Sequence, residues 1–450
     1  MKDLTKGPIF TTLLRFAIPT FFGSLFQLFY SLTDTRIVGT YLGEQALAAV
    51  GGSAVLCNLM ISFMNGMTIG FTVPMSRFYG GKNYHALRKA FALAGCMGLL
   101  ICTLFVTLAQ LFMDNLLEFM KMEEYLRADA KSYCTTLILG MFFTFTYNLG
   151  AASLRALGNS ITPLLLLICS SFLNVGMDIY FIRELELGVF GAALATVLAQ
   201  GISATLCITY LWKKYPILHF KLQDIKPEAS IIRELLASGC SMAFMSSLVQ
   251  TGTLMLQTAI NGLGQNIVVA HTAARKITEI FMIAFSISGS SMCTFTGQNV
   301  GAKEYERVRK AIFGVLTFLA GWVVVMILLA NTVAKDMVYL ITGSTNQEVQ
   351  ETATLYLRFD TLFYMVAASV TLFRNVLQGF GNHITPIVSS SVELVGKVVF
   401  AKIMVPYLGY WGVILAEPVA WIFMVIPLLV QILRNPYLRK TKESLAKISS

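Results

Sequence analysis

The stretch Pro19–Gly39 carries a carboxylate, Asp34, inside an apolar segment long enough to cross a membrane. An aspartate within a spanning helix costs roughly 2.5–3.5 kcal/mol on insertion scales, so it usually faces a protein interior or a wet cavity. Gln27 and Tyr30 lie seven and four residues earlier, which places them on the same helical face as Asp34. The segment therefore predicts one wall of a polar pathway. The alternative is that Asp34 lies at the helix end and only reaches headgroup water.

A second polar group follows in the stretch Phe172–Tyr180. Asn174 and Asp178 are four residues apart, so they stack on one helical face. Thr196 falls in the next predicted helix, which a short connection makes antiparallel and adjacent. Carboxylate, amide and hydroxyl oxygens suit a hard cation such as sodium, and two close carboxylates can share a proton. The alternative is an interhelical hydrogen bond without a transport role.

The amino-acid composition indicates that these groups lie in a membrane protein and not in a water-soluble one. Of 450 residues, 56% are hydrophobic and 13% are charged, and apolar runs of about twenty residues recur along the chain. We therefore predict an all-α integral membrane protein whose first helix is retained rather than cleaved. The eight cysteines form no CxxC pair, so neither a disulfide framework nor a zinc site is expected. No phosphate-binding GxxxxGK[ST] sequence occurs, which argues against direct coupling to ATP.

About twelve runs have the length of transmembrane helices, and the basic residues alternate between the loops that join them. The N-terminus, every second loop and the tail are basic, while the intervening loops are short or acidic. By the positive-inside rule both termini are cytoplasmic in a multi-pass cell-membrane protein, so the net charge of +10 does not indicate nucleic acid. The predicted spans are 12–36, 46–75, 90–113, 132–156, 161–183, 188–212, 234–262, 267–297, 311–332, 353–379, 384–406 and 409–433.

An internal repeat divides the chain into two halves. The sequence GGKNYHALRKA at Gly80–Ala90 returns 221 residues later as GAKEYERVRKA at Gly301–Ala311. Each copy contains six helices, an even number, so both copies enter the membrane from the same side and the repeat is parallel. This pattern is typical of transporters that bind their substrate between two lobes. Two further pairs keep nearly this displacement, namely Gly158–Pro163 with Gly381–Pro386 and Leu187–Ala193 with Leu408–Ile414.

The predicted organisation is two pseudo-symmetric six-helix lobes joined through the cytoplasm. The amino-terminal lobe spans residues 1–212 and the carboxy-terminal lobe spans residues 234–433. Between them lies a polar, basic linker, residues 213–233, and a cytoplasmic tail follows at 434–450.

Four motifs together resemble those of the multidrug and toxic compound extrusion (MATE) family over essentially the whole chain. They are Pro19 with Gln27, Tyr30 and Asp34, then LGEQALAAVG at Leu42–Gly51, GQNVGAKEYERVRKA at Gly297–Ala311, and LQGFGNHITP at Leu377–Pro386. In the branch usually named after DinF, the resemblance implies a cation site in the amino-terminal lobe. Its residues here would be Asp34, Asn174, Asp178 and Thr196, with Gln27 and Asn148 nearby.

The carboxy-terminal lobe does not repeat these acids. In the repeat alignment Met255 and Val399 occupy the places of Asp34 and Asp178. This lobe instead has two opposite-charge pairs at a spacing of four residues, which permits an ion pair on one helical face. Such pairs are either structural or line and gate a substrate cavity. They are Arg275 with Glu279, and Glu393 with Lys397.

The expected function is that of a transporter and not of an enzyme. The resemblance implies a monomeric secondary antiporter without a cofactor, which exports organic, cationic or amphipathic compounds through alternating access, driven by sodium or protons. Its partners would be small organic substrates and membrane lipid. One alternative is a lipid-linked saccharide flippase of the same general fold, which favours a strongly cationic cavity, whereas the first lobe's interior charges are mainly acidic. The other is an integral-membrane transferase, which predicts clustered acids or histidines at the membrane interface.

Overall fold

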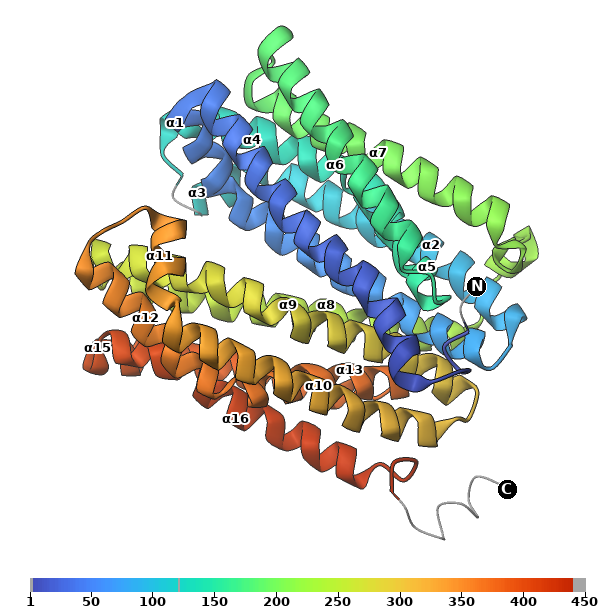
Figure 1. Ribbon diagram of the computed structural model, residues 1–450. Helices are drawn as coiled ribbons and strands as arrows, with labels where there is room; N and C mark the ends of the chain where they lie inside the picture. The colour runs from blue at the N-terminus through green and yellow to red at the C-terminus, as the bar shows by residue number, and fades with distance from the viewer. Residues whose placement is uncertain (1–2, 120–121, 440–450) are drawn as a thin grey trace. The chain divides into compact units, whose positions relative to one another are not determined.

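The computed structural model describes residues 3–119 and 122–439, and every regular element within them is a helix (Figure 1). The chain forms two compact units. The amino-terminal unit contains residues 18–243, and the carboxy-terminal unit contains residues 4–17 together with the described residues from Phe244 onward. The predicted lobe limits stay predictions, because these are packing units and not sets of membrane spans.

The helices follow one another with short connections. Up to the linker they are α1 (Ile9–Gly80), α2 (Tyr84–Leu111), α3 (Met113–Phe119), α4 (Glu124–Leu139), α5 (Met141–Ala156), α6 (Ile161–Ile179), η1 (Tyr180–Glu184) and α7 (Gly188–Lys214). The linker holds η2 (Pro216–Leu218) and η3 (Leu222–Ile225). Then come α8 (Ala229–Asn261), α9 (Gln265–Gly301), α10 (Tyr305–Thr332), α11 (Ala334–Thr342), α12 (Gln347–Leu362), α13 (Tyr364–Phe380), α14 (Ile384–Val399), η4 (Phe400–Met404), α15 (Val405–Leu408) and α16 (Tyr410–Arg434).

The described helices correspond by position to the twelve predicted spans. Helix α1 supplies two, because Gly43 breaks it with φ 82° and ψ −176°, a conformation that glycine adopts readily. Within the described residues seven helices are long and apolar enough to cross a membrane, or nine when the bent pairs α4–α5 (43°) and α12–α13 (55°) each count as one span. The other three predicted spans correspond to the second half of α1, to α8, and to α14 with η4, which do not meet this test of length and hydropathy over their described residues.

The internal repeat is visible in the backbone. Lys82 and Lys303 both adopt left-handed conformations, with φ 55° and 61°, and Gly188 and Gly409 do so with φ 58° and 57°. The π-helical turns η1 and η4 begin 220 residues apart, each following a helix that carries buried polar side chains. Equivalent positions in the two halves therefore share turn geometry as well as sequence.

The start of α8 packs tightly in the amino-terminal unit. A side chain at Gly70 would bring its Cβ to 2.4 Å from the Ser238 carbonyl oxygen, so the second half of α1 and α8 touch backbone to backbone. Three carboxylates fix the chain that leads into α8: Asp224 pairs with Arg88 of α2 at 3.1 Å, Glu228 with Lys89, and Glu234 with Arg77. The second half of the linker is therefore bound to this unit.

Asp224 makes this attachment sensitive to acid. The Lys221 backbone N–H (2.8 Å) and, next, the charge of Arg88 hold the pKa of Asp224 below its usual range, although burial opposes them. A depressed carboxylate pKa stabilises the fold above the unfolded pKa of about 4 and loses that contribution as pH falls through the folded value. We expect the protection factors of the η3 amides, which are corrected for the intrinsic pH dependence of exchange, to be high at pH 7 and pH 5 and to fall sharply below about pH 4. The η3 amides of the Asp224→Asn variant should have low protection at every pH. The control Asp114→Asn, which breaks an exposed ion pair with Lys131, should leave their protection unchanged.

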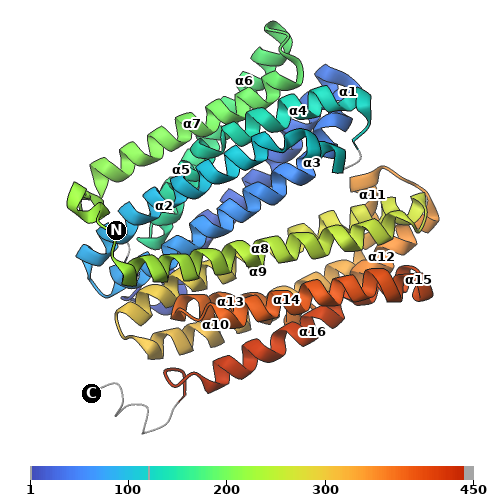
Figure 2. The same ribbon diagram turned by 180° about the vertical axis from the view of Figure 1, so that it is seen from behind.

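The carboxy-terminal unit is built around α9, α13 and α16, and Figure 2 shows α13, α14 and α16 side by side. Its core includes buried Tyr364 and Phe295. The segment before α1 is anchored here as well. The Leu4 backbone N–H donates to Gln298 Oε1 (3.1 Å), and Arg307 donates to the Gly7 carbonyl (2.9 Å). The repeated motif at Gly297–Ala311 therefore holds the start of the chain.

Candidate cation site and buried charge network

The predicted polar group on α6 and α7 forms one hydrogen-bonded cluster in the amino-terminal unit. Asp178 and Asn174 are 0% and 1% exposed. In the amide orientation that satisfies its neighbours, Asn174 donates to Asp178 Oδ2 (2.8 Å) and to Tyr30 Oη (3.1 Å). Its amide oxygen accepts from the Thr196 backbone N–H (3.1 Å). The spacing of four residues on α6 and the adjacency of α7 are thus both present.

Asp34 completes the cluster from α1. Its carboxyl group faces that of Asp178 within hydrogen-bonding reach. Tyr133 of α4 lies near both Asp34 and Tyr30, a neighbour that the sequence did not predict. A hydrogen bond between two carboxyl groups requires one proton, so the pair holds at most one negative charge while it is formed.

Two residues expected nearby do not join this hydrogen-bond network in the described structure. Gln27 is exposed on α1, although it shares the helical side of Tyr30 and Asp34. Asn148 is half-buried on α5. Neither residue donates to or accepts from the cluster in the described structure.

The cluster has spare capacity to bind a positive charge. Asp178 Oδ1 is buried without a hydrogen-bond partner, and no ion pair to Asp34 or Asp178 is present in the described part of the chain. An unpaired buried carboxylate is costly, so a proton or a cation is the natural complement. The donors fit sodium, which prefers oxygen ligands such as these carboxylates, an amide and a hydroxyl. Within the described residues no group of three His, Cys, Asp or Glu side chains suits a transition metal.

The carboxy-terminal unit contains a different arrangement. Arg275 of α9 pairs with Glu417 of α16 at 2.8 Å. The predicted pair of Arg275 with Glu279 is wrong, because Glu279 lies at the surface and pairs with Lys276 at 3.1 Å. Arg275 instead points inward, where the nearest carboxylate belongs to another helix.

The predicted pair on α14 is confirmed and belongs to a longer chain of charges. Lys397 contacts Glu393 at 3.1 Å and Glu417 at 3.4 Å, while Arg374 of α13 contacts Glu393 at 3.6 Å. From Arg374 to Arg275 the charges alternate in sign across α13, α14, α16 and α9. We name these five residues the buried charge chain. Its formal charge is +1, since three cations face two carboxylates.

Asp360 of α12 lies beside this chain and was missed by sequence reasoning. It is fully buried, near Arg275 and Glu417, and neither carboxylate oxygen has a hydrogen-bond partner. When ionised it would bring the formal charge of the group to zero. Asp360 and Glu417 each interrupt an apolar run, as Asp34 does, and the rule that singles out Asp34 would have found both.

The fold and the buried oxygen cluster define a multi-pass membrane transporter. The MatE family model matches residues 19–180 and 241–403, and the chain belongs to this family of multidrug and toxic compound extrusion antiporters. It is therefore not an enzyme, as the sequence predicted, and neither the flippase nor the transferase alternative is favoured.

Relatives and solved structures agree with this assignment. "Probable multidrug resistance protein YoeA" of Bacillus subtilis is 25% identical, over 93% of this chain and 88% of its own length. Multidrug export protein MepA of Staphylococcus aureus is 22% identical over 85% of each chain. An outward-facing MATE family transporter of the MOP superfamily superposes with a TM-score of 0.88 at 23% identity, over 98% of both chains. The predicted fold of twelve helices in two lobes is confirmed.

Proposed function

We propose that this antiporter exports organic, cationic or amphipathic compounds in exchange for sodium or protons entering the cell, by alternating access. The observation that carries the proposal is the pair of half-buried Asp34 and buried Asp178, which no cation of the described residues compensates. The names of the relatives, which describe multidrug resistance and export, support organic substrates. The oxygen-bearing side chains Asp34, Asn174, Asp178 and Thr196 support placing the protein in the branch named after DinF.

The coupling follows from charge. A proton or a sodium ion neutralises the pair and favours one arrangement of α1, α6 and α7, whereas the emptied pair repels and favours another. Because the ion and the substrate stabilise different states of the same unit, the ion gradient can drive the substrate outward. No cofactor is needed for this exchange.

The substrate path is proposed to use the polar side chains around these charges. Tyr30 fits this role best, because its hydroxyl accepts a hydrogen bond from Asn174 and lies close enough to Asp34 to feel the charge of that carboxylate. Gln27 and Asn148 would contact the substrate directly, since neither is engaged by the ion cluster. In the other unit the proposed residues are Arg275, Glu393 and Lys397, with Glu279 at the surface.

Transport into vesicles with separately imposed gradients tests the proposal. We expect a fluorescent organic cation to accumulate inside the vesicles when a sodium or proton gradient directed out of the vesicles is imposed, and not when both gradients are collapsed. The ion that drives the movement is the coupling ion. Uphill movement that requires ATP, or movement of lipid-linked sugars alone, would contradict the proposal.

The orientation is proposed from the charge distribution. The basic linker 213–233 and both termini would be cytoplasmic in the cell membrane, and the protein would act as a monomer. Single cysteines placed in the linker should react with an impermeant maleimide only after the cells are opened. Labelling in intact cells would reverse the orientation.

A further inference from the structure

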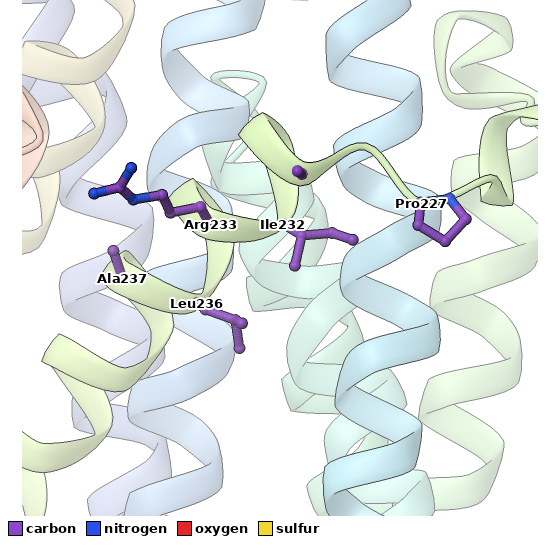
Figure 3. Close-up of a pocket in the computed structure, with 6 residues that line it drawn as sticks. Pro227, Ile232, Arg233, Leu236 and Ala237 are labelled. Carbon is purple, nitrogen blue, oxygen red and sulfur yellow. The ribbon is translucent and has the colours of Figure 1, made fainter.

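The first turns of α8 carry a concavity of about 720 Å³ on the surface of the amino-terminal unit. In Figure 3 the Ile232 side chain extends toward Pro227 of the lead-in, and the Arg233 guanidinium projects clear of the helix on the other side. The spacing of four residues places Ile232 above Leu236 and Arg233 above Ala237. The lining is Pro227, Ala229, Ile232, Arg233, Leu236 and Ala237, so a single guanidinium borders an apolar wall.

Arg233 is the one cation in the lining of the concavity, and no carboxylate of the described residues compensates it. All three carboxylates of the segment 221–237 are already paired with cations of α1 and α2, as described above. Arg233 is exposed, and no described residue forms an ion pair or hydrogen bond with it. Its neighbour Glu234 turns away to Arg77. The concavity therefore has a net positive rim that no protein group neutralises.

The predicted span in α8 covers residues 234–262, so the concavity would lie at the end of this span, near the lipid headgroups. Helix α8 has 33 residues and is about 50 Å long at about 1.5 Å per residue, which exceeds the hydrocarbon thickness of about 30 Å. Its first turns follow the polar linker, so in a membrane-spanning α8 they would emerge from the hydrocarbon into the interface. A group bound there has an apolar side and a charged side available at once.

We propose that this concavity binds an anionic phospholipid, with the headgroup phosphate on Arg233 and an acyl chain along Ile232 and Leu236. A guanidinium presents paired N–H donors that match a phosphate, and basic sites at helix ends on the cytoplasmic side attract anionic headgroups. The apolar wall distinguishes a lipid from free phosphate, because only a lipid gains from covering it. This site is separate from the ion cluster and goes beyond the proposed export activity.

Native mass spectrometry of the purified full-length chain tests the proposal. The protein in detergent is titrated with dioleoyl phosphatidylglycerol, with dioleoyl phosphatidylcholine as the zwitterionic match. We expect phosphatidylglycerol to remain bound preferentially, Arg233→Gln to weaken it about fivefold, and Arg233→Lys to restore most of the affinity. Lys214→Gln, which removes an exposed cation from the end of α7, should leave binding unchanged.

Two further measurements distinguish a bound phospholipid from other occupants of the concavity. Leu236→Ser should weaken the phospholipid, and inorganic phosphate at millimolar concentration should not displace it. Equal retention of the two lipids, or equal binding by the parent chain and Arg233→Gln, would overturn the proposal. Displacement by phosphate alone would show instead that the site takes a free anion. Because every arm measures binding, failure of the lipid site is distinct from failure of transport.

Discussion

Replacing Asp34 by asparagine is expected to abolish uphill transport while leaving substrate binding within about tenfold of the parent, a change of about 1.4 kcal/mol. The amide removes the charge that Asp178 faces and resembles the neutralised pair in shape. The amino-terminal unit should then remain in the arrangement of its ion-loaded state. Binding survives because the Asn174 bonds to Tyr30 and Thr196 do not involve Asp34.

Binding and gradient-driven export should be measured in one preparation of Asp34→Asn. The matched control is Asp114→Asn, which neutralises an exposed aspartate of the same unit, paired with Lys131. That variant should bind and export at the parental rate. Intact uphill export by Asp34→Asn would exclude Asp34 from coupling, and loss of both binding and export would make its role structural.

Replacing Glu417 by glutamine is expected to lower the free energy of unfolding by about 3 kcal/mol. Glu417 is the one carboxylate of the buried charge chain that joins Arg275 to Lys397. Without its charge, half-buried Arg275 and buried Lys397 lose a shared partner, and the formal charge of the chain rises from +1 to +2. Removing one member of a buried ion pair costs far more than the pair contributes, because the remaining charge stays desolvated.

Unfolding in mixed micelles of rising sodium dodecyl sulfate measures this effect. Glu279→Gln is the control, since it breaks a pair whose side chains are about half exposed, and it should change stability by less than about 1 kcal/mol. A stability of Glu417→Gln equal to that of the control would show that water or a bound ion compensates the two cations. Asp360, which lies beside Arg275, is the nearest group that could take over part of the role.

Helical spacing predicted the group of Asn174, Asp178 and Thr196, and the family resemblance added Asp34. Of the buried charge chain, spacing predicted only the pair of Glu393 with Lys397. Asn174 and Asp178 share a face of α6, and the short connection to α7 leaves Thr196 little choice of neighbour. The same rule applied to Arg275 chose Glu279, because spacing says which side chains can meet on one helix and nothing about the helices around it. The actual partner, Glu417, is 142 residues further along the chain.

The spans show the same limit. Twelve apolar runs and the break near Gly43 follow from hydropathy and local sequence, which act within a few residues. The bends between α4 and α5 and between α12 and α13 were not predicted, since neither junction contains a proline and the kinks depend on how neighbouring helices pack. Asp360 sits just before the second bend. It could have been predicted as a buried acid from its apolar surroundings, but its position beside Arg275 could not.

The two π-helical turns, η1 and η4, occur at corresponding places in the internal repeat. A π turn inserts one residue into a helix, and such an insertion persists when it serves a site. In this protein the insertion occurs after α6 and again after α14, at equivalent places in the two halves. The two turns begin 220 residues apart, within one residue of the 221-residue displacement of the repeat, so the extra residue belongs to the frame that the two halves share. The paired acids beside one turn and the alternating charges beside the other are therefore two different sets of side chains carried on one shared backbone frame.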